Sequence, residues 1–177
     1  MGRTSRQESI DRPKTVYNSL MKQKSNFWPY AAFILLSLLV GGLAALVSMD
    51  GMRRFQDLQQ SALTPPPLIF SLVWTVLYIL MGVSAALVYL ADPRGLKEAH
   101  IYYGGTLLLN FLWPLLFFAL ELRLAALVVL LVMIALAIGV VLRYRPWSIP
   151  ASNLQLPYTL WLFFACYLNL VTYQLNG

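Results

Sequence analysis

The chain has only one cysteine, Cys166, and one histidine, His100. A lone cysteine cannot form an internal disulfide, and one cysteine with one histidine cannot supply the ligand set of a protein metal centre. The sequence also lacks a Gly-rich phosphate loop and a Ser-His-Asp arrangement. These absences argue against chemistry carried by side chains alone, and we predict no metal site, no cofactor and no catalytic residue.

Charged residues are scarce as well. They make up 11% of the chain, against about 25% in soluble domains, and 59% of the residues are hydrophobic. Five uncharged stretches are each near or above the length of a transmembrane helix, at about 27–49, 67–91, 101–120, 124–142 and 154–175. None shows the alternation of apolar and polar residues that marks a membrane β-strand. The sequence therefore predicts an all-α integral membrane protein, a bundle of five transmembrane helices.

The interior of these stretches contains no Asp, Glu, Lys, Arg or His, because His100, Glu121 and Arg123 all lie at their ends. Ion-coupled transporters and proton pumps usually keep an ionisable group at mid-membrane depth. The sequence therefore argues against both classes of protein.

Basic residues fall unequally on the two sides of the predicted spans. One side receives Arg3, Arg6, Arg12, Lys14, Lys22, Lys24, Arg94, Lys97, Arg143 and Arg145, and the other receives Arg53, Arg54 and Arg123. Under the positive-inside rule the N-terminus is cytoplasmic and the C-terminus outside, and we expect a bacterial inner or plasma membrane. The net charge of +6 then follows from topology. A basic tail could bind RNA or anionic lipid; we favour lipid and predict no nucleic-acid partner.

Two segments outside the spans have distinct compositions. Residues 1–26 are polar and basic, and no small-residue cleavage site follows the first apolar stretch, so we predict a flexible tail before a membrane domain at 27–177. Residues 50–64 form the longest connection and precede Pro65, Pro66 and Pro67, with Thr64 as a helix cap. Connections of this length are often lids or binding loops, so we predict a lid; a disordered spacer is the alternative.

Asn110 lies near the middle of the third stretch, four residues before Pro114. Proline has no amide hydrogen, so the carbonyl of Asn110 loses its helical partner. Asn110 thus offers a side-chain amide and a free carbonyl at a depth where polar groups need partners. Two interpretations stay open: a hydrogen bond between helices, contributing about 0.6 kcal/mol on average, and contact with a ligand.

Large aromatic residues recur at helical spacing on three of the spans. They and their neighbours on the same faces are Asn110, Trp113 and Phe117; Tyr158, Trp161, Ala165, Leu168 and Asn169; and Phe70, Trp74 and Tyr78. An apolar cavity with a few polar anchors is the usual composition of a small-molecule site. The pattern predicts such a cavity, and tight aromatic packing between helices is the alternative.

The same motifs, in this order, resemble the translocator protein family, also called tryptophan-rich sensory proteins or peripheral-type benzodiazepine receptors. They are Pro65-Pro66, Val73-Trp74-Thr75, Leu77-Tyr78, Met81-Gly82, Leu109-Asn110 with Trp113 and Phe117-Phe118, and Pro157-Tyr158 with Trp161, Phe164-Ala165 and Leu168-Asn169. The resemblance covers about residues 27–177. It implies a five-helix bundle that commonly forms homodimers and binds porphyrins, sterols and benzodiazepine-type drugs between the helices and beneath the first loop.

The resemblance also implies which residues meet the ligand. It places Asn110, Trp113, Trp161 and Ala165 in the pocket and the proline pair in the lid, and the small residues near Gly41 either leave room for a ligand or form a packing seam. With the aromatic faces added, the predicted ligand-binding residues are Asn110, Trp113, Phe117, Tyr158, Trp161, Ala165, Leu168, Trp74, Tyr78, Gly41, Ala45, Leu63, Pro65 and Pro66.

The chain departs from the family pattern at two places. Leu63 stands where members often carry a tryptophan implicated, with the tryptophan of the fifth helix, in light-dependent porphyrin degradation. No cation follows Tyr173, so the sterol motif of animal members is incomplete. We therefore predict a membrane receptor or binding protein for porphyrin-like or other planar hydrophobic ligands, in tetrapyrrole homeostasis, stress sensing or transport. The alternatives are a porphyrin-degrading enzyme and a structural or partner-binding membrane protein without a small-molecule site.

Overall fold

A computed structural model describes residues 27–91 and 96–176 of the chain, and the side chains of 27–91 and 101–176. The predicted tail at 1–26 lies outside the described residues. Within them the chain is helical and contains no strand. The elements are α2 (Phe27–Phe55), α3 (Pro67–Ala91), α4 (Leu96–Pro114), the π-helix η1 (Leu115–Ala119), α5 (Arg123–Tyr144), α6 (Ile149–Leu154) and α7 (Leu156–Asn176).

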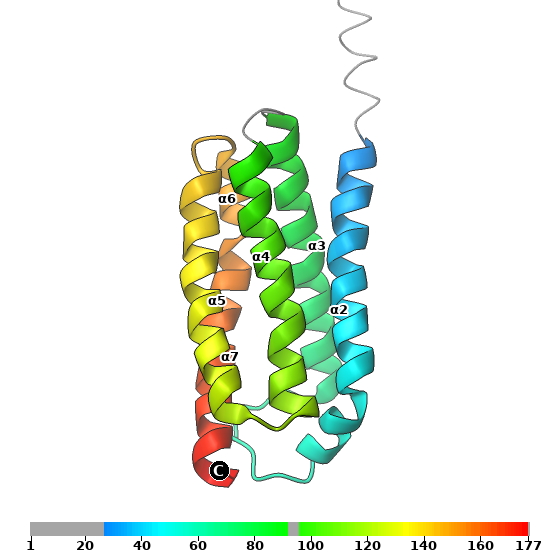
Figure 1. Cartoon of the computed structure of the whole chain (residues 1–177), viewed down its shortest axis with the longest axis vertical. Helices are drawn as coiled ribbons and strands as arrows, with labels where there is room; N and C mark the ends of the chain where they lie inside the picture. Colours follow the sequence, from blue (N-terminus) through cyan, green and yellow to red (C-terminus); the bar gives the residue numbers. More distant parts are fainter. Residues whose placement is uncertain (1–26, 92–95, 177) are drawn as a thin grey trace, which may run out of the picture.

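In the part of the chain that the structure describes, five helical segments are long and apolar enough to cross a membrane. They are Phe27–Phe55, Pro67–Ala91, Ile101–Ala119, Arg123–Tyr144 and Ile149–Asn176. They run side by side along the long axis of the molecule, and successive spans point in opposite directions (Figure 1). The predicted all-α bundle of five membrane-spanning helices is confirmed.

Three predicted boundaries differ from the structure. Helix α2 continues past the expected end at residue 49 to Phe55, because the polar residues there, including the ion pair of Asp50 with Arg53 at 3.6 Å, are compatible with a helix. The connection to α3 is therefore residues 56–66, which we call the lid, instead of 50–64. Helix α4 begins inside the expected connection at 92–100, and α6 lies within the one at 143–153, where Ser148 caps it.

Glycines bring α2 close to its neighbours. A Cβ atom added at Gly82 of α3 would lie 2.6 Å from the Cα of Ile34, and one added at Gly51 of α2 would meet the carbonyl of Phe118. Small residues at such positions let helix backbones approach closely in membranes. Polar contacts add to this packing, since the Tyr103 hydroxyl lies 2.6 Å from Ser37 Oγ and donates to the Phe33 carbonyl at 2.9 Å.

The third span changes its helical geometry after Pro114. The ring of Pro114 leaves no amide hydrogen for the carbonyl one turn earlier, and the chain continues as the π-helix η1, with Leu120 N donating to the Leu115 carbonyl at 2.9 Å. Each residue of a π-turn advances by a smaller angle than in an α-helix. Phe117 and Phe118, which both lie in this π-turn, are buried.

The lid and the C-terminal end of α7 lie at the same end of the bundle (Figure 1). Helix α2 packs on α3, α4 and η1, and α5 packs on α4 and α7. Helix α3 contacts α6 more extensively than α7, and α6 lies at the far end from the lid. The bundle is thus closed by side chains at one end and leaves space between α3, η1 and α7 beneath the lid.

Candidate functional site

The main cavity lies beneath the lid and has a volume of about 360 Å³. It is bounded by the end of α2, the lid, the start of α3, the α4–η1 segment and α7. Its lining residues are Met52, Phe55, Gln56, Gln60, Thr64, Pro65, Pro66, Pro67, Phe70, Ser71, Trp113, Phe117, Phe118, Ala165, Leu168, Asn169 and Thr172. Its size lies at the lower end of the range of about 300–1,000 Å³ that small-molecule sites occupy.

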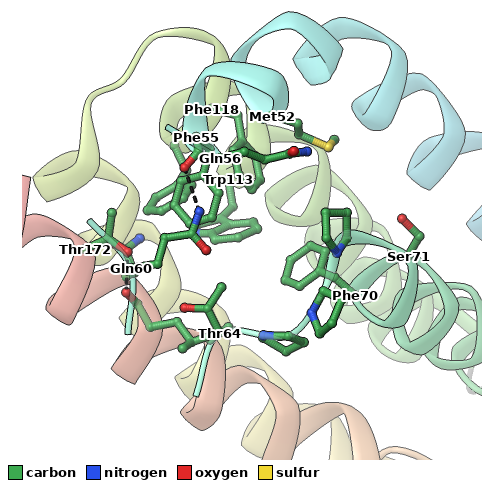
Figure 2. A pocket seen from close by; sticks show the side chains of 17 residues that line it. Met52, Phe55, Gln56, Gln60, Thr64, Phe70, Ser71, Trp113, Phe118 and Thr172 are labelled. Atoms are coloured by element: carbon green, nitrogen blue, oxygen red, sulfur yellow. Dashed lines mark hydrogen bonds between the residues drawn. The ribbon is translucent and has the colours of Figure 1, made fainter. Parts of the chain in front are cut away.

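Aromatic rings stand on opposite sides of this cavity. Figure 2 shows Trp113 and Phe118 on one side and Phe70 on the other, with Gln60 of the lid on the side of Trp113. The Gln60 amide donates to the Phe55 carbonyl at 2.8 Å, so its position is fixed by the end of α2. A flat ligand between these rings would have aromatic contacts on both of its faces.

A second cavity of about 240 Å³ adjoins the first. It lies between α2, α3 and α4, and it shares Met52, Phe70, Ser71, Trp113 and Phe118 with the main cavity. Its other lining residues are Leu38, Gly41, Gly42, Ala44, Ala45, Trp74, Thr75, Tyr78, Asn110 and Pro114. Gly42 and Ala45 on α2 and Thr75 on α3 are exposed, so this cavity reaches the outer surface of the bundle between the two helices.

The wall between the two cavities is a stack of three rings. The ring centroids of Trp113 and Trp74 are 6.3 Å apart with their planes at 25°, and those of Trp113 and Phe117 are 5.3 Å apart at 17°. Stacked aromatic pairs of this spacing contribute about 0.5–1.5 kcal/mol beyond the burial of their surface. The stack fixes the Trp113 ring, which lines both cavities, at the centre of an apolar surface.

Few polar groups reach this surface, and most of them already have partners. Asn110 donates to the Thr106 carbonyl at 2.9 Å and accepts from the Tyr158 hydroxyl at 3.2 Å. An amide has two donor hydrogens and two acceptor lone pairs, so Asn110 keeps one of each. The indole Nε1 of Trp74 is buried and has no hydrogen-bond partner among the described residues. The second cavity is therefore lined by Asn110, which keeps residual hydrogen-bonding capacity, while the Trp74 indole N–H is enclosed by protein without a partner in the described part of the chain.

Asn169 is the polar residue of α7 in the main cavity. In the amide orientation that satisfies both of its polar atoms, it accepts from Trp113 Nε1 at 3.2 Å and donates to the Arg123 carbonyl at 3.0 Å. It thereby joins the α4 and α5 segments to α7. Asn169 fixes the edge of the Trp113 ring, and its amide is occupied by protein partners.

Comparison with known proteins places this geometry in a family. The family model described as TspO/MBR matches residues 33–174. The chain belongs to the TspO/MBR family. It is 35% identical over 152 residues to the translocator protein of Bos taurus, covering 84% of this chain and 90% of that one. It is 34% identical over 158 residues to the tryptophan-rich protein TspO of Archaeoglobus fulgidus, covering 86% and 99%.

A further relative is the tryptophan-rich sensory protein of Cereibacter sphaeroides, 31% identical over 122 residues that cover 69% of this chain and 76% of that one. Family membership and the five apolar helices together make the chain a multi-pass integral membrane protein in contact with the bilayer. Membership in the TspO/MBR family also supports a general role in ligand binding or sensing at the membrane.

The structure divides the predicted binding residues of this TspO/MBR protein into three groups. Those lining the main cavity are Trp113, Phe117, Ala165, Leu168, Pro65 and Pro66. Those lining the second cavity are Trp113 again, with Asn110, Trp74, Tyr78, Gly41 and Ala45. Those lining neither cavity are Leu63, Tyr158 and Trp161.

The third group lies outside the cavities for three different reasons. Leu63 is on the outer side of the lid and 61% exposed. Tyr158 is fully buried, and its hydroxyl donates to the side-chain oxygen of Asn110. The Trp161 ring packs against Phe70, at 5.9 Å between ring centroids, and Phe70 lines the main cavity whereas Trp161 lines neither cavity. Tyr158 and Trp161 thus support lining residues, and neither forms the lining itself.

Sequence reasoning missed several lining residues. Met52 and Phe55 lie on the part of α2 that was predicted to be loop, so no helical face was assigned to them. Gln60 is a single polar residue of the connection, with no pattern around it. Thr172 carries a signal, because it follows Leu168 by four positions and Asn169 by three, on the face already assigned to the fifth span. Phe70 does carry a signal, because it precedes Trp74 by one helical turn.

Proposed function

We propose that this protein is a membrane receptor or binding protein for porphyrin-like or other planar hydrophobic ligands, acting in tetrapyrrole homeostasis, stress sensing or transport. The observation that carries the proposal is the ring stack of Trp74, Trp113 and Phe117 along the cavity wall. The stack holds Trp113 and Phe117 in the lining of the main cavity, where a planar apolar ligand gains from burial and from contact with aromatic rings.

Each part of the site has a role in this proposal. Trp113 and Phe118 contact one face of the ligand and Phe70 the other. The remaining hydrogen-bonding capacity of Asn110 binds a polar edge that extends into the second cavity. Ala165 is 3% exposed and lines the main cavity from α7, where a small side chain leaves room for the ring system. The lid covers the ligand from the aqueous side.

A filled-cavity variant tests this function against a matched control. In purified protein, tryptophan fluorescence is titrated with protoporphyrin. Ala165→Phe places a ring inside the main cavity, whereas Ala32→Phe places the same ring on an exposed position of α2. We expect saturable quenching in the wild type, an apparent Kd raised about tenfold or more in Ala165→Phe, which is about 1.4 kcal/mol, and a change below about twofold in Ala32→Phe. Non-saturating quenching that is equal in all three proteins contradicts the proposal.

The proposal includes the placement of the protein in its membrane. The excess of basic residues supports a cytoplasmic N-terminus in a bacterial inner or plasma membrane, with the lid and the C-terminus outside. The resemblance supports a homodimer. Labelling of single introduced cysteines in intact cells tests the orientation: a cysteine at Gln56 in the lid reacts with an impermeant maleimide only if that end faces outward.

The two alternative functions find less support in the geometry. A porphyrin-degrading enzyme that used two facing indoles would need them at positions 63 and 161, where Leu63 is exposed and Trp161 lies behind Phe70. A structural or partner-binding role leaves the two aromatic-lined cavities without an explanation.

A further inference from the structure

The centre of the lid is attached to the last residue of α7. The backbone N–H of Gln59 donates to Asn176 Oδ1 at 3.0 Å, and Asn176 Nδ2 donates to the Gln59 carbonyl at 2.9 Å. The same Nδ2 donates to the Thr172 carbonyl at 3.0 Å. The Asn176 side chain thus bonds both the backbone N–H and the backbone carbonyl of Gln59. Its bond to the Thr172 carbonyl fixes its own orientation on α7.

A second, weaker contact joins the lid to α7. The hydroxyl groups of Ser61 and Tyr167 are 3.3 Å apart. Tyr167 precedes Asn176 by nine positions, which is about 13–14 Å along a helix. The two contacts therefore hold the lid against α7 over a length of several turns, with Asn176 making the larger number of hydrogen bonds.

Internal hydrogen bonds join the residues in the second half of the lid. Thr64 N donates to the Ser61 carbonyl at 2.9 Å, and Leu63 N donates to Ser61 Oγ at 3.2 Å. In the first half of the lid, the Gln60 side chain donates to the Phe55 carbonyl at the end of α2. In the same part of α2, Arg54 Nε donates to Glu121 Oε1 at 2.8 Å. The lid is continuous with α2 and α3, so its contacts with α7 are the ones that can separate without unfolding either helix.

The line of contact between the lid and α7 is also an edge of the main cavity. Ala165, Leu168 and Thr172 of α7 line the cavity, and so do Gln60 and Thr64 of the lid. The backbone of α3 makes few close approaches to α7. Separation of the lid from α7 would therefore open the main cavity directly to the aqueous side.

We propose that Asn176 is the latch of the main cavity: release of its two hydrogen bonds to Gln59 opens a path between the lid and α7, through which the ligand of the proposed function passes. Asn176 acts as a positioning residue, since it lines neither cavity. Loss of the latch accelerates binding and release together, because it raises the fraction of open protein and changes no ligand contact.

The first test needs no ligand. In a Cys166→Ser background, Ala165→Cys places a reporter thiol on the wall of the main cavity, and its labelling by a water-soluble maleimide measures how often the cavity opens. Adding Asn176→Ala should raise the labelling rate about tenfold, which corresponds to a shift of the opening equilibrium by a factor of ten. Asn153→Ala, an exposed asparagine of α6 at the far end, is the matched control and should leave the rate unchanged.

The conservative variant separates a latch from a general loss of structure. Asn176→Asp keeps an acceptor for the Gln59 N–H and removes the donor to its carbonyl, so its labelling rate should fall between those of wild type and Asn176→Ala. Equal labelling rates in wild type, Asn176→Asp and Asn176→Ala overturn the latch, whatever protoporphyrin does.

Stopped-flow quenching by protoporphyrin then tests the ligand path. We expect the association and dissociation rates of Asn176→Ala to rise by a similar factor and Kd to change by less than about threefold. If wild type shows no saturable binding, the proposed function fails while the labelling result still decides the latch. Saturable binding with unchanged rates means that the ligand does not pass between the lid and α7, and the opening of the second cavity between α2 and α3 becomes its route.

Discussion

The indole Nε1 of Trp113 lies 3.2 Å from the side-chain oxygen of Asn169, across the gap between α4 and α7. Both residues are buried, and both line the main cavity. The hydrogen bond fixes the ring that stacks on Trp74 and Phe117. The wall of the cavity is therefore held from α7 as well as from α4, and two substitutions can test this link.

A double-mutant cycle measures the link. Trp113→Phe removes the donor and keeps a ring in the stack, and Asn169→Leu removes the acceptor at similar volume. We expect each to lower the free energy of unfolding in detergent and the pair to lower it by less than the sum, with a coupling of about 0.6 kcal/mol, the average for hydrogen bonds between membrane helices. Trp28 is 75% exposed, so a cycle of Trp28→Phe with Asn169→Leu should be additive. Additivity in both cycles contradicts the bond.

Gly51 permits the close approach of α2 to η1. In Gly51→Ala the new Cβ would meet the carbonyl of Phe118, which is backbone and cannot rotate away. Overpacking of this kind typically costs about 1–3 kcal/mol, so we expect a clear fall in Tm and a change in the shape of the main cavity. In Gly104→Ala nothing lies within 4 Å of the new atom, and helix propensity predicts a neutral or slightly stabilising effect. Equal Tm values for the two variants would rule out this close contact.

Much of the site could be predicted because its residues carry helix-period signals. Asn110, Trp113 and Phe117 recur on one face of a span, and Trp74 and Tyr78 on one face of another. Helical geometry alone places each set on one side of its helix. Such spacing predicted the aromatic lining of the cavities, which the structure indeed divides between these helices.

The rest could not be predicted because it depends on neighbours and on local backbone geometry. Spacing puts Trp161 on the same face as Ala165, but only the fold shows that Phe70 covers Trp161. The π-helix after Pro114 turns Phe118 into the cavity, and a proline signals a lost hydrogen bond without specifying how the chain responds. The extension of α2 to Phe55 replaced part of the predicted lid, because charge ends a membrane span without ending a helix.

Glu121 sits between η1 and α5 with a φ of 56°, in the left-handed region. Its carboxylate pairs with Arg54 at 2.8 Å and with Arg123 at 3.8 Å. Glu121→Ala removes both ion pairs and leaves a residue with a Cβ atom in the left-handed conformation. Glu121→Gly also removes both ion pairs, but it relieves the strain of that conformation, which is about 1–2 kcal/mol. We expect the glycine variant to be more stable than the alanine variant by about 1 kcal/mol in chemical unfolding.

Arg54→Gln is the control for the ion pair at this turn. It removes the pair with Glu121 and leaves the backbone of Glu121 unchanged. Both side chains are about half exposed, so we expect a loss of less than about 1 kcal/mol. An alanine variant as stable as the glycine variant would show that the turn relaxes out of the left-handed conformation.

The positions of Leu63 and Trp161 predict that this protein binds porphyrin without degrading it in light. The Trp161 ring contacts Phe70 and Phe164 and lines neither cavity, and Leu63 supplies no second indole. We expect the absorbance of illuminated, bound protoporphyrin to decay no faster than that of free protoporphyrin. In Trp161→Phe, the Kd for protoporphyrin should stay within about twofold of the wild-type value, since conservative changes outside a contact surface alter binding little.

Leu63→Trp sharpens the test, because it restores the missing indole at the position where the family pattern has one. Residue 63 is 61% exposed and lines neither cavity, so we expect this variant to remain inactive in light as well. Decay faster than free protoporphyrin in the wild type, abolished by Trp161→Phe, would establish the enzyme instead. Decay that appears only in Leu63→Trp would show that the lid can turn residue 63 inward, and that a single substitution separates a binding protein from a photochemical one.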